Sequence, residues 1–117
     1  MSILATNAYR SLIAAAVAAG GSVPEPTEIA FGTGTTEPSV DDTELETELV
    51  RKDLGSVSVD GMTVNVTGAL LGTESGVSVI TEMGVFAADG TLMGRRTFAP
   101  KTLEPESRID FDLDFSF

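Results

Sequence analysis

Carboxylates are the only side chains in this sequence whose type and spacing suggest chemistry, because it contains no histidine and no cysteine. The usual general base, the thiol nucleophile and the commonest metal ligands are therefore missing. Asp110, Asp112 and Asp114 form one candidate cation cluster near the C-terminus. At a spacing of two residues they would project from one strand face about 7 Å apart, too far to share an ion unaided. A solvated strand face is the favoured interpretation, and cation binding is the alternative.

Three other patterns give weaker signals. Asp41, Asp42 and Glu44 gather acidic groups, but they lack the glycine and the terminal glutamate of a calcium loop. The stretch GTGTT is glycine-rich, but no Gly-Lys-Ser/Thr follows it, so it is not expected to bind phosphate. Asn65 fits an N-glycosylation acceptor but lies inside a predicted strand, which favours a chance match.

Aspartate and glutamate could run glycosidase chemistry, which needs only a pair of carboxyl groups. However, one tyrosine and no tryptophan leave little aromatic platform for a sugar. We therefore expect no enzymatic activity, no cofactor and no metal site.

The net charge of −11 comes from 18 acidic and 7 basic residues. Such a surface repels nucleic acid and anionic membranes, since both need clustered Lys and Arg, and we expect neither as a partner. Only two basic residues are lysines, Lys52 and Lys101, which suggests a protein adapted to high salt. A salt-adapted fold should loosen in dilute buffer, whereas an ordinary acidic domain would keep the same melting temperature.

An N-terminal helix is predicted over residues 5–20. Asn7 is a plausible N-cap, and Gly20-Gly21 is a good C-terminal stop after a run of alanine and leucine. The same run resembles a signal-peptide core, but the only early basic residue, Arg10, lies beside it and not at the terminus. We interpret it as a structural helix.

The predicted helix is apolar nearly all the way round, so it needs burial against its own sheet or a partner chain. Covering by the sheet of the same chain would leave a monomer. Burial between copies would make the helix an interface, for which we predict the apolar positions Leu4, Ala8, Leu12, Ile13, Ala15 and Val17.

Residues 27–117 are predicted to form a β body. Residues 27–32 give the first short strand, and residues 41–53 fit either a helical turn or a strand. Asp60-Gly61 and Asp89-Gly90 each predict a two-residue type I′ hairpin, and residues 72–76 a turn. In residues 109–117 apolar residues alternate with Asp and Ser, as expected for a half-solvated strand.

The second hairpin has a predicted register, in which Val85 faces Gly94 and Glu82 faces Thr97. Arg95 would then lie diagonal to Glu82. We expect this to be an exposed ion pair worth about 0–1 kcal/mol, which aids register and is not a site.

One domain over residues 1–117 is expected from the length. Its fold class is mainly β: an antiparallel β-sandwich of about six to seven short strands with one N-terminal α-helix.

Three segments, in order, resemble the N-terminal domain of tail-collar-type tail-fibre proteins of tailed bacteriophages. LATNAYRSLIAAAVAAGG resembles the opening helix, and TEIAFGTGTTEPS the strand and Gly-Thr loop that follow it. ITEMGVFAADGTLMGRRTF is similar to the family's Glu-hydrophobic-Gly-hydrophobic-Phe strand, Asp-Gly turn and return strand. The matching positions are Glu82, Gly84, Phe86, Asp89 and Gly90.

The resemblance implies a virion structural protein of a tailed virus, located in the tail or baseplate. It implies a homotrimer or hexamer that contacts neighbouring tail or baseplate proteins. No shaft or receptor-binding region follows Phe117, which favours an adaptor over host recognition, and the low lysine content hints at a halophilic host. Two alternatives stay open: a head decoration or vertex turret protein, and a monomeric carbohydrate- or cation-binding module.

Overall fold

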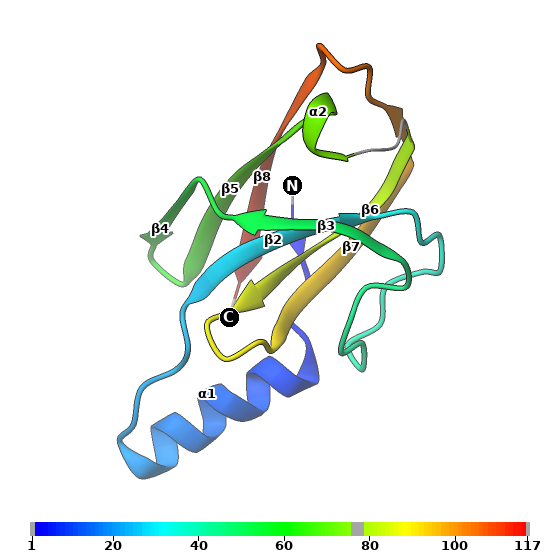
Figure 1. Cartoon of the computed structure of the whole chain (residues 1–117). Helices are drawn as coiled ribbons and strands as arrows, with labels where there is room; N and C mark the ends of the chain where they lie inside the picture. The colour runs from blue at the N-terminus through cyan, green and yellow to red at the C-terminus, as the bar shows by residue number, and fades with distance from the viewer. Residues whose placement is uncertain (1, 76–78, 117) are drawn as a thin grey trace.

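The computed structural model describes residues 2–75 and 79–116, which form eight strands, one long helix and one short helix (Figure 1). The mainly β class and the N-terminal helix are confirmed, but the strand number exceeds the six to seven predicted. The helices are α1 (Asn7–Ala19) and α2 (Gly72–Ser75). The strands are β1 (Ser2–Ile3), β2 (Pro26–Gly32), β3 (Glu48–Asp53), β4 (Ser56–Asp60), β5 (Thr63–Leu71), β6 (Val79–Ala87), β7 (Leu92–Thr102) and β8 (Arg108–Ser116).

The strands form two four-stranded sheets, in the orders β1-β8-β5-β4 and β3-β2-β6-β7. All pairings are antiparallel except that of β1 with β8, which run parallel with Ser2 opposite Asp114. The antiparallel prediction is therefore correct for seven strands and wrong for the shortest one.

One hydrophobic core lies between the two sheets. Phe31 of β2 meets Phe111 of β8 across it, with ring centroids 5.1 Å apart, and Leu113 and Phe115 are buried beside them. Asp110 and Ser116 on the other face of β8 are exposed. The predicted alternation of this strand is confirmed, and the sheets pack face to face as a sandwich requires.

The first strand, β1, was not predicted, because two residues carry no periodic signal. Its neighbourhood depends on Gly94, which pairs with Ala5. A Cβ at Gly94 would lie 2.8 Å from the Leu4 carbonyl oxygen and 2.7 Å from a ring carbon of Phe115. The glycine therefore lets the N-terminal segment pass close to the sheet.

Helix α1 begins and ends on capping groups, but its N-cap differs from the prediction. Thr6, not Asn7, caps it: the Thr6 hydroxyl accepts a hydrogen bond from the Tyr9 N–H at 3.2 Å. The same hydroxyl donates to the Leu92 carbonyl at 2.5 Å, so the cap also fixes the helix to β7. Gly20 ends the helix at a φ of 68°, as its sequence position predicted.

Both Asp-Gly hairpins form, but neither has the predicted type I′ turn, which needs positive φ at both central residues. Asp60 pairs with Thr63, so the loop is Gly61-Met62 with only the glycine at positive φ, 62°. The second loop spans residues 88–90, closed by a 2.9 Å bond from the Ala87 N–H to the Thr91 carbonyl. This turn is one residue longer than predicted, and Asp89 does not have the positive φ that a type I′ turn needs.

The structure defines the ambiguous segment of residues 41–53 and the turn predicted at residues 72–76. Of residues 41–53, only Glu48–Asp53 form a strand, and the preceding residues belong to a long loop, residues 33–47. The turn predicted at 72–76 is the single helical turn α2, while Gly76 lies outside the described residues. Among the described helices, none is both long and apolar enough to cross a membrane.

Replacing Thr6 by alanine should lower the free energy of unfolding by about 1–3 kcal/mol, because it removes the cap and leaves the buried Leu92 carbonyl without its donor. Thr6→Ser keeps the hydroxyl and should lose less than half as much. Urea unfolding of both variants measures the difference. Equal losses would contradict a role for the hydroxyl.

Candidate functional site

Glu82 is the centre of a buried polar cluster. Its side chain is fully buried, and its Oε2 lies 2.7 Å from the Nε of Arg95, whose side chain is 3% exposed. The register prediction is confirmed, since Glu82 pairs with Thr97 and Val85 with Gly94. The prediction of an exposed pair is wrong, because residues 33–47 fold over it.

The Glu82 carboxylate holds both ends of that loop. Its Oε1 accepts from the Gly34 N–H at 3.0 Å and from the Thr47 N–H at 2.7 Å. Its Oε2 accepts from the Glu46 N–H at 3.1 Å. Hydrogen bonds to an ionised acceptor are about twice as strong as neutral ones. A single side chain of β6 therefore fixes where the loop leaves β2 and where it enters β3.

These bonds also set the protonation state of Glu82. Burial acts to raise the pKa of Glu82, but hydrogen bonds from the Thr47 N–H, Arg95, the Glu46 N–H and the Gly34 N–H outweigh it and hold the pKa below its ordinary value. The carboxylate is therefore ionised at neutral pH.

The Gly-Thr motif serves this carboxylate. A Cβ on either Gly32 or Gly34 would lie 2.6 Å from Glu82 Oε1, and one on Gly32 would lie 2.1 Å from the Thr47 carbonyl oxygen. Thr81 of β6 adds a 2.8 Å bond from its hydroxyl to the Gly34 carbonyl. The stretch GTGTT, which was not expected to bind phosphate, thus lies against the carboxylate of the protein's own Glu82.

The remaining motif residues build a second contact between loop and sheet. Leu45, from the loop, is buried with Ala30, Phe86 and Leu92. A Cβ at Gly84 would lie 2.7 Å from a Leu45 methyl carbon, so the glycine makes room for it. The guanidinium of Arg51 lies 3.7 Å from the centroid of the Phe86 ring, a cation–π distance.

The loop presents the acidic residues that the sequence analysis grouped. Asp42 lies 3.4 Å from Arg95 Nη1 and accepts from the Ser39 N–H at 2.8 Å, and Asp41 accepts from the Asn7 side-chain amide at 3.0 Å. Together with Thr36, Thr43, Glu44, Leu45, Glu46 and Arg95 they line an open pocket of about 310 Å³. Asn7 also donates its N–H to the Val40 carbonyl at 2.7 Å, which ties the start of α1 to this loop.

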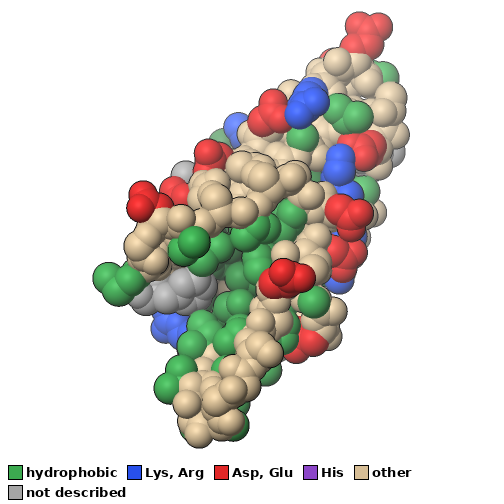
Figure 2. All heavy atoms as spheres, turned by 90° about the vertical axis from the view of Figure 1, so that its left-hand side faces the viewer, with side chains coloured by type: hydrophobic (Ala, Val, Ile, Leu, Met, Phe, Trp, Pro, Cys, Tyr) green, Lys and Arg blue, Asp and Glu red, His purple; other side chains and the backbone are tan. Residues whose placement is uncertain are grey.

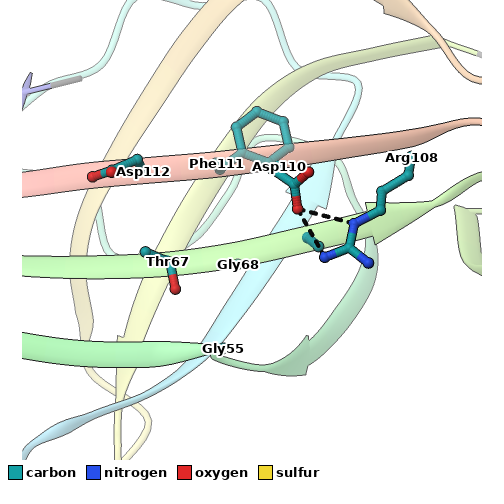
Figure 3. Close-up of a pocket in the computed structure, with 8 residues that line it drawn as sticks. Gly55, Thr67, Gly68, Arg108, Asp110, Phe111 and Asp112 are labelled. Atoms are coloured by element: carbon teal, nitrogen blue, oxygen red, sulfur yellow. Dashed lines mark hydrogen bonds and ion pairs between the residues drawn. The ribbon is translucent and has the colours of Figure 1, made fainter.

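Of the three aspartates of β8, Asp110 and Asp112 are exposed and Asp114 is half-buried. The Asn65 amide donates to Asp114 at 2.8 Å and also to Asp112, and Asp110 pairs with Arg108 at 2.9 Å. Figure 3 shows Arg108 and Asp110 turned toward each other beside a shallow pocket of about 340 Å³. Over residues 2–75 and 79–116, no three Asp, Glu, His or Cys side chains are placed to hold a metal ion.

The predicted helix interface divides into two sets. Ala8, Leu12 and Ile13 are half-buried, and the last two pack against the core. Leu4 and Val17 are 60% and 80% exposed, and Ala15 is also exposed. Tyr9 was not predicted as an anchor of the helix, but it is buried, and its hydroxyl donates to the Pro24 carbonyl at 2.9 Å.

The importance of Glu82 and Arg95 was missed, but β6 carries a signal for it. Nearly all of Val79–Ala87 is buried on both faces, and its sequence VITEMGVFA has one charge. Charged residues are almost never fully buried unless they are paired, so a lone glutamate in a strand that is apolar on both faces predicts a buried partner.

Comparison with known proteins gives one family. Residues 1–100 match the family model described as phage tail-collar fibre protein, N-terminal. That match contains the helix α1, the loop of residues 33–47, and the hairpin β6–β7 except the last two residues of β7. A search of curated proteins found no match.

Replacing Glu82 by glutamine should lower the free energy of unfolding by about 3–5 kcal/mol, since it removes the closest counter-charge of the buried Arg95 and leaves it with Asp42, which is more distant at 3.4 Å and partly exposed. Glu48→Gln is the matched control: it removes a carboxylate that pairs with Arg51 at 2.7 Å on the surface. Exposed pairs contribute about 0–1 kcal/mol. Urea unfolding compares the two, and equal losses would contradict the buried pair.

The protein should lose stability in acid through Glu82. Its folded pKa lies below the unfolded value of about 4.3, so its contribution is complete above that pH and is lost as pH falls through the folded pKa. We expect the free energy of unfolding to fall less steeply with decreasing pH in Glu82→Gln than in the wild type. The two slopes should differ by at most the contribution of one bound proton. Unfolding curves from pH 7 to pH 3 measure both slopes, and identical slopes would contradict the assignment.

Proposed function

We propose that this chain, which belongs to the phage tail-collar fibre protein N-terminal family, joins tail parts as an adaptor and acts as a homo-oligomer. Membership of the family makes the chain a structural component of the virion tail. The adaptor role, the oligomer and the contact with fibre or baseplate proteins are the proposal.

The surface of α1 supports an oligomer. The helix carries one charged residue, Arg10, and of its own residues only Tyr9 is buried. Val17 stays largely exposed and Ala15 is exposed as well, as is Leu4, which precedes the helix. Figure 2 shows apolar side chains gathered between the lobe that α1 forms and the strands above it. An exposed apolar surface of this kind is typical of a contact between chains.

The position of α1 also suits a shared contact. Its start is fixed by Thr6 on β7 and by Asn7 on the loop of residues 33–47, and Leu12 and Ile13 pack against the core, while its last turn extends beyond the sheets (Figure 1). A helix covered by its own body on one side can offer its exposed side and its end to neighbouring copies. Closed symmetry would then bury the apolar residues in every copy, in a trimer or a hexamer.

The acidic surface fits assembly in high salt, which shortens the range of repulsion between copies. At a net charge of −11, copies repel each other in dilute buffer. We therefore propose that association strengthens as salt increases.

Replacing Val17 by glutamate should reduce the oligomer to monomers, because it places a charge in the proposed contact. Thr102→Glu adds the same charge at an exposed position near the end of β7, away from α1, and should leave the mass unchanged. Light scattering after size exclusion, in molar salt and in dilute buffer, measures the mass. A wild-type monomer in both buffers, or a Val17→Glu variant with wild-type mass, would contradict the helix contact.

A further inference from the structure

The two sheets have four edge strands in the described part of the chain: β1 and β4 in one sheet, and β3 and β7 in the other. An edge strand presents a row of unpaired N–H and C=O groups, which can pair with another chain. Natural proteins protect such edges by shortness, charge, proline, bulges or a covering segment. A comparison of the four edges therefore indicates where pairing with another chain is blocked and where it is open.

Three of the edges are protected. β1 has only two residues. β3 reads ELVRKD, with four charges, and its pairing with β2 is interrupted by a bulge. β7 carries Pro100 and Lys101, and its register with β6 has two irregularities. Its start is covered by the N-terminal segment, where the Thr6 N–H donates to the Met93 carbonyl at 2.8 Å.

β4 is the least protected of the four described edges, since Asp60 at its end is its one charged residue. It pairs with β5 in a continuous register over all five of its residues, and all five are exposed. Its sequence SVSVD contains no lysine, arginine or proline. Val57 lies opposite the core residue Val66, and Val59 lies opposite the half-buried Val64, yet they remain 49% and 71% exposed. In Figure 1 the strand lies at the outer margin of its sheet.

We propose that β4 pairs antiparallel with β4 of a second copy, about a two-fold axis at Ser58. The sequence of the strand is complementary to itself in this arrangement. Val57 lies opposite Val59 of the second copy, which joins the apolar side chains of both strands on one face. Ser56 lies opposite Asp60 of the second copy, where a hydroxyl can donate to a carboxylate.

Charge does not oppose this pairing, although the whole chain carries −11. Asp60 is the only charged residue of β4. In the proposed register the two Asp60 side chains lie four residues apart along the seam, about 14 Å at 3.4 Å per residue. That exceeds the Debye length of about 8 Å at physiological salt, so their repulsion is largely screened.

This contact is distinct from the helix contact of the proposed function, and the two can coexist. A ring of three copies joined through α1, paired with a second ring through β4, has dihedral symmetry and contains six copies. The five-residue seam is smaller than a standard interface of about 1,600 Å², so its association is best measured at high protein concentration.

Ser58 variants test the two-fold axis directly, because in this register alone residue 58 faces itself. Ser58→Lys and Ser58→Glu each place like charges opposite one another and should weaken pairing at least fivefold. An equimolar mixture of the two places opposite charges together and should restore it. Ser58 is exposed on β4, and circular dichroism checks that each variant is folded.

Sedimentation velocity of the full chain in 0.15 M salt, up to millimolar concentration, gives the mass of each sample. We expect the wild type to form a species with twice the mass of its smallest species as concentration rises. Each variant alone should not form the doubled species, and the mixture should form it again. Doubling in the single variants, no doubling in the wild type, or no recovery in the mixture would overturn the proposal. Val17→Glu changes the helix and leaves β4 unchanged. Doubling through β4 should therefore persist in that variant even if the helix contact is lost.

Discussion

A buried carboxylate must have partners for every lone pair, and in this protein that requirement organises the structure around Glu82. An ionised side chain with no exposed surface is tolerated only when charges and hydrogen-bond donors surround it closely. Arg95 supplies the charge, and three backbone N–H groups of residues 34, 46 and 47 supply the donors. The chain between β2 and β3 has to return to the same point of β6, so a fifteen-residue excursion becomes a defined loop.

The consequences of this constraint reach the surface that assembly would use. The loop carries Leu45 into a second apolar cluster on the sheet and presents Val40 to the first residue of α1. Thr6 fixes the same end of the helix to β7, the strand that also bears Arg95. The buried ion pair, the loop and the base of α1 thus form one continuous set of contacts. The helix contact proposed above would depend on this rigidity, because a closed ring of copies requires the helix at a fixed angle.

Periodicity in the sequence was sufficient for the regular parts of the fold. The alternation in β8, the apolar run of α1 and the two Asp-Gly turns place strands, helix and hairpins correctly, because each depends on neighbours in the chain. The errors fall where distant residues decide. Thr6 replaces Asn7 as N-cap because its hydroxyl also reaches Leu92, 86 positions along the chain. β1 forms only because β8 is there to pair with it. The Glu82–Arg95 pair is buried by a loop whose path no local pattern describes, although one charge in an apolar strand was the available sign.

Hydrogen exchange shows whether the Glu82 carboxylate holds the loop of residues 33–47 in place. The amides of Gly34, Glu46 and Thr47 bond to Glu82, whereas Val66 lies in the core and does not. We expect the three loop amides to exchange slowly in the wild type and to approach unprotected rates in Glu82→Gln, while the Val66 amide stays the more protected. Equal protection of the loop amides in both proteins would contradict this role of Glu82.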